Sequence, residues 1–291
     1  MLNQQNLRLI DQHIRHVIQG LISYQEFKIH PLNPEFTLDS KYKYSESIDI
    51  YAEAMQLLKN KKCHLSQDQM YEYVFEYIQS QAKRIVDEDS KYQRGEIKNQ
   101  RSLQAYLQQL LNHYARLLFV RVDFAIKQEF QAEMSLEQFQ TYLKTMSNRY
   151  ANQDGCFSGL QGYVWAIEEG IDKGLHCHTL LIYDGAKHQN DFGLSLQVTQ
   201  YWTDLTQGKG HYFISNKPDY KKKFAEQGTL GIGMIHRNNP QEVKNALNIA
   251  MYLANPDKEL QHLRIRRPRM RTFGTAQFTR KNRRGMKHSS P

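Results

Sequence analysis

The sequence predicts an α+β fold in which an antiparallel sheet carries helices on one face and follows a helical N-terminal region. Three observations lead to this prediction. The first hundred residues place apolar side chains at helical spacing. From residue 103 onwards, short β-prone runs alternate with helical segments. These segments contain the order β-α-β-β-α-β, the ferredoxin-like connectivity, which favours helices on one face of a largely antiparallel sheet.

Residues 1–102 are expected to form the helical N-terminal region, whose role the sequence does not reveal. Apolar residues recur at helical spacing over 3–25, and 48–59 has the pattern of a second helix. Ser66 and Gln69 have the spacing of a capping box, which predicts a third helix to about residue 86. The polar and charged stretch 87–101 is interpreted as a linker.

Residues 103–260 are expected to form the sheet-containing domain. Ser135 and Gln138 have the spacing of a second capping box, and Asn239-Pro240 is a typical helix start. The triple lysine at 221–223 is expected in a loop. In chain order, the patterns predict a helix at 103–114, a strand at 117–126, a helix at 135–149, a hairpin at 162–183, a helix at 191–205, strands at 208–214 and 230–236, and a helix to 254.

Composition and cysteine content limit the class of protein. No apolar run reaches the roughly 18 residues of a membrane span, so no membrane association is expected. The N-terminus lacks the basic and apolar pattern of a secretion signal. Three widely spaced cysteines favour a reducing cytoplasm over a disulfide framework.

Residues 261–291 are expected to form a basic C-terminal tail. The chain carries a net charge of +9, and the stretch from Arg264 to Lys287 holds eight arginines, two lysines and no acid. Such a block suits a nucleic-acid backbone, although a solvated terminus that aids solubility is the alternative. The residues expected to contact DNA are Lys209, Arg264, Arg266, Arg267, Arg269 and Arg271.

The hairpin carries the candidate metal ligands. His176 and His178 lie two residues apart in a predicted strand, so their side chains point to the same face. If Gly170 and Gly174 face each other across the turn, Glu168 lies opposite His176 on that same face. One carboxylate and two imidazoles can bind a divalent cation and leave positions open for substrate. The alternative is that Glu168 is a solvated strand residue, and a register slip of one position would move it to the other face.

The final predicted helix carries the candidate nucleophile. Its apolar stripe contains Ala246 and Ala250, whereas Tyr252 falls on a different stripe. A tyrosine there could be a surface residue, an interface contact or a nucleophile that attacks a phosphodiester. A phenol ordinarily titrates near pH 10, so it needs a metal or a nearby cation to react as phenolate. Lys258 could supply that cation.

At these motifs the chain resembles the HUH endonucleases, whose metal motif separates two histidines by one hydrophobic residue. More narrowly, it resembles the inovirus-type replication proteins, also described as the YagK/YfjJ C-terminal domain group. The resemblance spans about residues 117–275 and is carried by segments in a fixed order: 163–168, 174–182, 201–213, 231–237, 250–254 and 269–274.

This resemblance implies a rolling-circle replication initiator of phage or prophage origin. It would nick single-stranded origin DNA with Mg²⁺ or Mn²⁺, retain the 5′ end on Tyr252 and leave a 3′-OH, with the host replication machinery as a possible partner. The metal ligands would be Glu168, His176 and His178. The chain departs from the usual Tyr-x-x-Lys motif, because position 255 is Asn and the next lysine is Lys258.

Two other functions are compatible with these patterns. A non-catalytic DNA-binding regulator of phage or prophage origin would use the basic tail without cleavage. An HUH transposase or relaxase would share the chemistry and differ in the DNA ends that it joins. The sequence predicts neither the origin sequence nor the oligomeric state.

Overall fold

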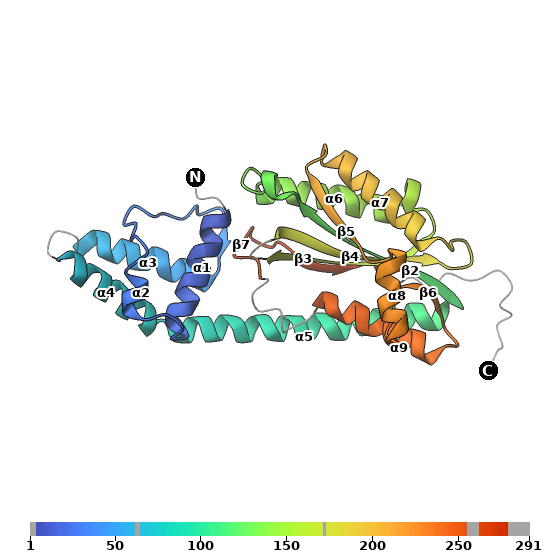
Figure 1. The fold of residues 1–291 in the computed structure, drawn as a ribbon, viewed down its shortest axis with the longest axis horizontal. Helices are drawn as coiled ribbons and strands as arrows, with labels where there is room; N and C mark the ends of the chain where they lie inside the picture. The colour runs from blue at the N-terminus through green and yellow to red at the C-terminus, as the bar shows by residue number, and fades with distance from the viewer. Residues whose placement is uncertain (1–3, 62–64, 171–172, 255–261, 279–291) are drawn as a thin grey trace.

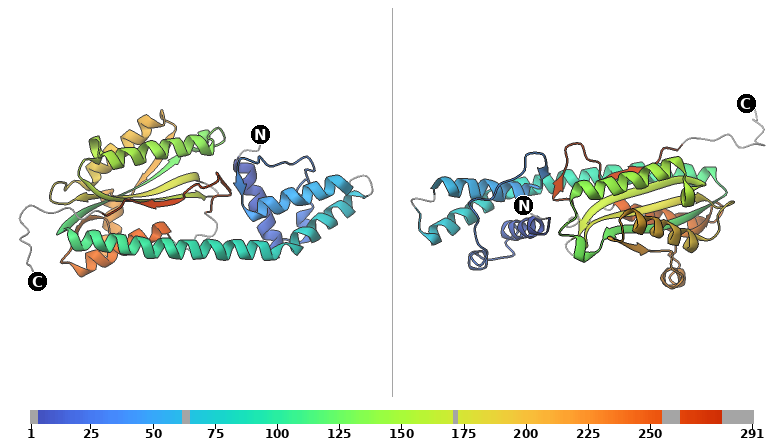
Figure 2. Two further views of the ribbon diagram at one scale, coloured as in Figure 1. Left: turned by 180° about the vertical axis from the view of Figure 1, so that it is seen from behind. Right: turned by 90° about the horizontal axis from the view of Figure 1, so that it is seen from above.

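The computed structural model describes residues 4–61, 65–170, 173–254 and 262–278 (Figure 1). A group of N-terminal helices lies at one end of the molecule and a sheet lies at the other, and one long helix runs along both (Figures 1 and 2). None of the helices in these ranges is both long and apolar enough to cross a bilayer. The helices of the N-terminal half are α1 (Gln4–Ile18), α2 (Tyr24–Phe27), α3 (Glu46–Lys61), α4 (Gln67–Ser80) and α5 (Ala82–His113).

The predicted helical N-terminal region is confirmed, with one break that the periodicity did not indicate. The capping box of Ser66 and Gln69 opens α4. The expected helix over 3–25 divides at Gly20, which has a φ of 69° that ends a right-handed helix. The chain then restarts as α2 behind a capping box formed by Ser23 and Glu26.

The predicted linker over 87–101 is wrong, because these residues form the middle of α5. The segment contains no proline, and its Lys, Arg, Glu and Gln residues favour helix. A helix that bridges two packed units can be polar on most of its surface, so the absence of an apolar stripe does not end it. Arg15 of α1 also holds it, through Asp89 at 2.9 Å and Glu88 at 3.2 Å. The predicted domain boundary at 102 therefore falls inside one helix.

The sheet confirms the α+β class and the predicted connectivity. Its main path has the strand order β5-β2-β4-β3-β8, β6 also pairs with β2, and each of these pairs is antiparallel. The chain follows the order β2-α6-β3-β4-α7-β5, which is the ferredoxin-like β-α-β-β-α-β unit. The bounds are β2 (Arg116–Ile126), α6 (Leu136–Asn152), β3 (Leu160–Gly170), β4 (Gly174–Asp184), α7 (Asp191–Leu205), β5 (Gly210–Ile214), α8 (Pro218–Glu226), β6 (Gly233–His236), α9 (Pro240–Met251) and β8 (Phe273–Thr275).

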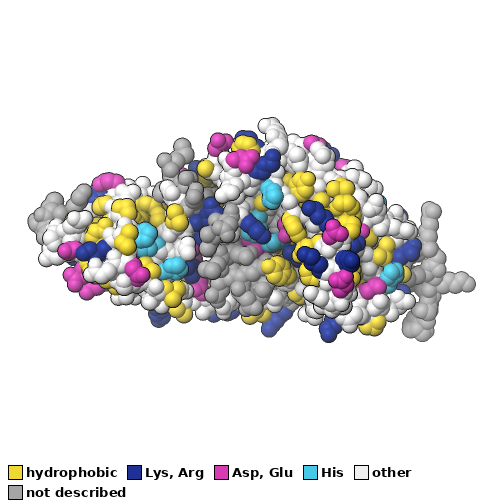
Figure 3. Space-filling model, in the orientation of Figure 1, with side chains coloured by type: hydrophobic (Ala, Val, Ile, Leu, Met, Phe, Trp, Pro, Cys, Tyr) yellow, Lys and Arg dark blue, Asp and Glu magenta, His cyan; other side chains and the backbone are white. Residues whose placement is uncertain are grey.

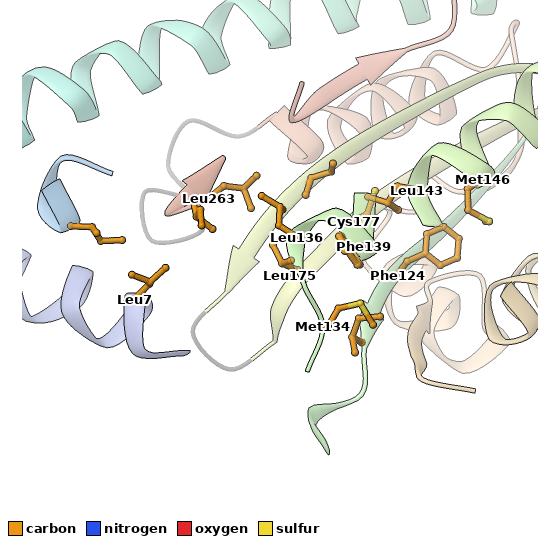
Figure 4. Close-up of a cluster of buried hydrophobic side chains, with 14 of the residues drawn as sticks. Leu7, Phe124, Met134, Leu136, Phe139, Leu143, Met146, Leu175, Cys177 and Leu263 are labelled. Atoms are coloured by element: carbon orange, nitrogen blue, oxygen red, sulfur yellow. The ribbon is translucent and has the colours of Figure 1, made fainter. Parts of the chain in front are cut away.

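Helices cover both faces of the sheet, whereas the sequence predicted helices on one face only. On one face, α6 and α7 pack on the sheet around Phe124, Phe139 and Trp202 (Figures 1 and 4). On the other face, α5 and α9 pack on Leu180 and Ile182 of β4. The reason is that β4 carries apolar side chains on both of its faces, so both faces are buried. The face with the candidate metal ligands is therefore partly covered by helices.

Two further details differ from the sequence prediction. The lysines at 221–223 lie in α8, where Pro218 occupies the first turn, and not in a loop. Part of the predicted tail also belongs to the fold, because β8 pairs with β3 and β7 (Ile265–Arg266) pairs with β1 (Lys43–Tyr44). Residues 265–266 and 273–275 are thus strands of the fold, whereas residues 267–269 and 271 between them are exposed. Residues 279–291 lie outside the described part of the chain.

Candidate metal centre and tyrosine

The hairpin of β3 and β4 has the register that the sequence predicted. Gly170 pairs with Gly174, which places Glu168 opposite His176 and Ala166 opposite His178. Gly174 has a φ of +62°, and a Cβ there would lie 2.7 Å from Oε1 of Gln131, so the position favours glycine in two ways. The pairing of Gly170 with Gly174 therefore fixes which face the three candidate ligands share.

The three candidate ligands converge on one another. Oε2 of Glu168 lies 3.2 Å from Nε2 of His178 and 3.5 Å from Nε2 of His176. The two imidazole rings are 4.9 Å apart at an interplanar angle of 85°. All three side chains are buried, and their ligand atoms lie within 4.8 Å of one another. A carboxylate and two imidazole nitrogens therefore face a common point.

Neighbouring acceptors orient both imidazoles. Nδ1 of His176 lies 3.0 Å from the carbonyl oxygen of Gly174, and Nδ1 of His178 lies 2.9 Å from Oδ2 of Asp123. A carbonyl oxygen can only accept, and a carboxylate favours a proton on the nitrogen that faces it. Each Nε2 then keeps its lone pair for the shared point. Metal-binding histidines are usually fixed by such a partner on the second nitrogen.

Electrostatics in the site favour positive charge. Burial raises the pKa of Asp123, but the hydrogen bond and charge of His178, with Arg121, outweigh burial and lower this pKa below its usual value. Burial lowers the pKa of His178, but Asp123 and Glu168 outweigh it and raise this pKa. Two carboxylates so close to the imidazoles attract a proton or a cation to this point. The donor set fits a divalent metal ion and would leave coordination positions open.

Tyr252 lies beside this group. It follows α9, which begins behind its cap Asn239 and packs so closely on Gly231 that a Cβ there would lie 2.2 Å from the carbonyl oxygen of Asn245. The Tyr252 ring is 6.3 Å from the ring of His178, and its side chain is 46% exposed. The prediction that Tyr252 turns away from the packing face of α9 is confirmed, and the phenol remains accessible.

Two residues of the site escaped the sequence analysis. Cζ of Arg121 lies 5.2 Å from the centre of the Tyr252 ring, and Nε of Arg121 lies 3.6 Å from Oδ1 of Asp123. The sequence does contain a signal for both residues. Arg121 and Asp123 are the only charged residues within the apolar run 117–126, and their spacing of two puts them on one face. The register of β2 with β4 then brings Asp123 opposite His178.

A cavity of about 1000 Å³ opens in front of the site. Arg121, His176, His178 and Tyr252 line one part of it. Residues of β5, α8 and α9 line another part, and Lys127 and Lys173 also border it. The two candidate histidine ligands and the tyrosine therefore face one space that is large enough for part of a nucleotide chain.

The predicted cation and the predicted DNA contacts have different outcomes. Lys258 lies outside the described residues. Lys209 is near the cavity, because its carbonyl oxygen accepts from the backbone N–H of Lys127 and its ammonium lies 5.5 Å from the ring of Phe130. The prediction that Arg264 contacts DNA is wrong, because its side chain is buried and its Nε lies 2.9 Å from Oδ2 of Asp11. A buried and paired guanidinium holds the fold together and cannot reach DNA.

The other arginines of the predicted tail lie away from the candidate metal centre. Arg266 lines a separate cavity against α5 and the N-terminal helices. Arg267 and Arg271 line a pocket with α6, next to Trp165 and Cys177 on the opposite face of the sheet. Arg269 is exposed in the β7–β8 connection. The structure thus brings together the metal ligands and Tyr252, but it does not gather these arginines around them.

Comparison with known families agrees with the motifs. No curated protein and no solved structure matches the chain. The sequence matches the family model described as the YagK/YfjJ C-terminal domain over residues 88–276, which is more than half of the chain. This match includes Glu168, His176, His178 and Tyr252. The chain therefore belongs to the YagK/YfjJ C-terminal domain family.

Proposed function

We propose that this protein is a metal-dependent DNA endonuclease of the HUH type that initiates rolling-circle replication, as the inovirus-type replication proteins do. One observation carries the proposal: an accessible tyrosine lies beside a buried group of one carboxylate and two imidazoles, and both imidazoles line the same cavity as the tyrosine. The Tyr252 and His178 rings are 6.3 Å apart, and Tyr252 is 46% exposed. Cleavage of single-stranded origin DNA through a tyrosine requires both parts.

The residues of the chain divide the chemistry between them. Tyr252 attacks the scissile phosphorus, and a bond forms between its phenol oxygen and phosphorus while the bond to the 3′ oxygen breaks. The phenol gives up its proton to solvent, and the departing oxygen takes one up to become a 3′-OH. The 5′ phosphate stays on Tyr252, which conserves the bond for a later joining step. Arg121, beside the Tyr252 ring, stabilises phenolate and phosphate charge.

Glu168, His176 and His178 are the residues that would hold the metal ion, with Asp123 orienting His178. When bound there, Mg²⁺ or Mn²⁺ would supply Lewis-acid polarisation of a phosphate oxygen. Arg121 is a cation close to Tyr252, although the chain lacks the usual Tyr-x-x-Lys motif. Lys258 is a second candidate for that role.

The test is the formation of a covalent protein–DNA adduct. Purified protein is incubated with Mn²⁺ and labelled single-stranded DNA from its own replicon, and adducts are separated on denaturing gels. We expect wild type to form the adduct and Tyr252→Phe to form none. Tyr212→Phe is the matched control. Tyr212 is 38% exposed, but it pairs with Phe124, whose side chain packs against α6 and α7. Tyr212 therefore lies on the opposite face of the sheet from the metal centre.

Each alternative function has its own outcome in this experiment. Salt-sensitive DNA binding with no adduct under Mg²⁺ or Mn²⁺ would support a non-catalytic regulator and reject the nickase. An adduct that persists in Tyr252→Phe would assign the attack to another tyrosine. An HUH transposase or relaxase would form the same adduct, and the DNA ends that become joined would distinguish it from a replication initiator.

A further inference from the structure

We propose that the cavity in front of the metal centre binds an unpaired nucleobase of the substrate on an aromatic wall formed by Phe213, Tyr220 and Phe224. This inference rests on the proposed function for its substrate, single-stranded DNA. The wall belongs to β5 and α8, and all three rings line the cavity that contains Tyr252 and the histidines. None of these aromatic residues stood out in the sequence.

The sheet register places the wall on the face of the metal centre. Phe213 on β5 pairs with Asp123 on β2, and Asp123 pairs with His178 on β4. Residues that pair across strands point to the same side of a sheet. Phe213 therefore lies on the same face of the sheet as Asp123 and His178. It is 42% exposed, although its side chain is large and apolar.

The other two rings continue from Phe213. The ring centres of Phe213 and Tyr220 are 5.2 Å apart, and those of Tyr220 and Phe224 are 5.0 Å apart. Tyr220 and Phe224 are four residues apart on α8, so they share one side of that helix. No residue of α8 is buried. These rings therefore border open space and do not fill a closed core.

Charge and polarity around the wall suit a nucleotide chain more than an apolar ligand. Lys127, Lys173 and Arg121 border the same cavity and can neutralise phosphates. On the face in Figure 3, hydrophobic side chains lie next to Lys and Arg side chains, with some Asp and Glu among them, over the end of the molecule that carries the sheet. Asn248 of α9 is exposed in the cavity one helical turn before Tyr252, and its amide offers the donor and acceptor that a base edge requires.

This arrangement selects for single strands. A base can enter a cavity and stack on aromatic rings only if it is not paired and stacked in a duplex. A base on the wall would share the cavity with Tyr252, so it would belong to the same stretch of strand as the scissile phosphate. The wall would thus position the strand for attack without taking part in the chemistry.

The test compares two oligomers that differ only in their bases. A labelled oligothymidylate of about 12 nucleotides, a typical single-strand site size, and an abasic oligomer of equal length are titrated with full-length protein. EDTA is present, so that no covalent step occurs, and fluorescence anisotropy reports binding. We expect the protein to bind the oligothymidylate about 5-fold to 100-fold more tightly than the abasic strand, the range for loss of one stacked base.

Single alanine variants assign that difference to the wall. Phe213→Ala and Tyr220→Ala should each weaken binding of the oligothymidylate and leave binding of the abasic oligomer unchanged. Tyr212→Ala, which removes an exposed ring from the other side of β5, should change neither. Equal affinity for the two oligomers, or a difference that both wall variants preserve, would overturn the proposal. The binding assay measures no cleavage, so the two proposals can fail separately. If wild type forms the adduct but the wall variants bind the oligothymidylate as tightly as wild type does, only the wall is rejected. If binding depends on the wall but no adduct forms, only the nickase is rejected.

Discussion

Two adjacent residues on β3, Glu168 and Glu169, belong to two buried polar clusters of opposite character. Their side chains point to opposite faces because they are neighbours on a strand. Glu169 belongs to a junction cluster with Asp11, Arg15 and Arg264, where the hairpin meets α1 and the segment after residue 262. Glu168 belongs to the metal centre with the two histidines.

In the junction cluster, hydrogen-bond donors match the carboxylate oxygens. Oδ1 of Asp11 accepts from Nε of Arg15 at 3.2 Å and from the hydroxyls of Ser45 and Ser47, while its Oδ2 accepts from Nε of Arg264 at 2.9 Å. Burial raises the pKa of Asp11, but Arg15 and Arg264 outweigh burial and lower it. The carboxylate of Asp11 is thus paired with arginines from α1 and from the segment after residue 262, and these ion pairs join the two halves of the molecule.

In the metal centre, by contrast, Glu168 meets imidazole nitrogens that can themselves be metal ligands. A proton or a bound divalent cation would balance the negative charge of Glu168 at this point. Burial alone therefore does not distinguish a structural carboxylate from a functional one, whereas the type of partner does. Substitutions at Asp11, Glu168 and Glu169 should separate the two clusters by their effect on stability.

The largest loss of stability is expected for Asp11→Ala. The substitution leaves the guanidinium groups of Arg15 and Arg264 buried without their carboxylate, which typically costs about 3–5 kcal/mol. Urea denaturation followed by circular dichroism would measure it, with Glu133→Ala, an exposed carboxylate, as the control. A loss no greater than that of the control would mean that the junction cluster does not hold the two halves together.

A smaller and pH-dependent effect is expected at His13 in the N-terminal region. Burial, followed by the nearby His30 and His16, lowers the pKa of His13 to about 4. Below the unfolded value of 6.5, the unfolded chain binds a proton that the folded chain does not, so stability falls between pH 6.5 and 4. His13→Phe, which can keep the stacking on Phe27, should lessen the loss from pH 7.5 to 4.5 by about 1 kcal/mol after solvent screening.

The measurement is the urea midpoint of both proteins at each pH. Other groups titrate in both proteins alike, so only the difference between the two losses reports on His13. Equal losses in the two proteins would remove His13 as the acid-sensitive group of the N-terminal region.

The smallest effect on stability is expected for Glu168→Gln, within about 1 kcal/mol of wild type when no metal is present. The amide keeps the shape of the side chain and removes a negative charge that lies 3.2 Å from His178 and 3.5 Å from His176, both of which can be metal ligands. Mn²⁺ affinity, measured by calorimetry, should instead fall at least about 10-fold. Glu169→Gln, at the neighbouring position, is the matched control. It should lower the stability, because Arg8 and Arg264 lose a charged partner, and it should leave the Mn²⁺ affinity unchanged. Unchanged Mn²⁺ affinity in Glu168→Gln would remove Glu168 from the ligand set.

Local signals in the sequence predicted much of the fold and the core of the candidate site. Glycines at both ends of a short connection fixed the hairpin register, and the register fixed the shared face of Glu168, His176 and His178. Capping boxes at Ser66 and Ser135 located two helix starts correctly. These features depend on residues a few positions apart, so one sequence is enough to find them.

The features that escaped prediction depend on contacts between distant segments. Arg264 looked like part of a free basic tail, because its partner Asp11 lies 253 positions earlier in the chain. Residues 87–101 looked like a linker, because a bridging helix shows no apolar stripe. Arg121 became a site residue only when the strand order placed β2 beside β4 and α9 brought Tyr252 over it. Pairing partners of this kind cannot be read from local spacing.

The most direct test of the account is whether a bound Mn²⁺ ion lies next to the Tyr252 ring. Protein labelled with 3-fluorotyrosine at its eighteen tyrosines is titrated with Mn²⁺ and observed by ¹⁹F NMR, with Tyr252→Phe and Tyr212→Phe used to assign two resonances. Paramagnetic broadening falls steeply with distance, so the Tyr252 resonance should broaden early in the titration while that of Tyr212, on the other face, stays sharper. The broadening should disappear in His176→Ala. A Tyr252 resonance that stays sharp while Mn²⁺ binds, or that broadens equally in His176→Ala, would contradict the account.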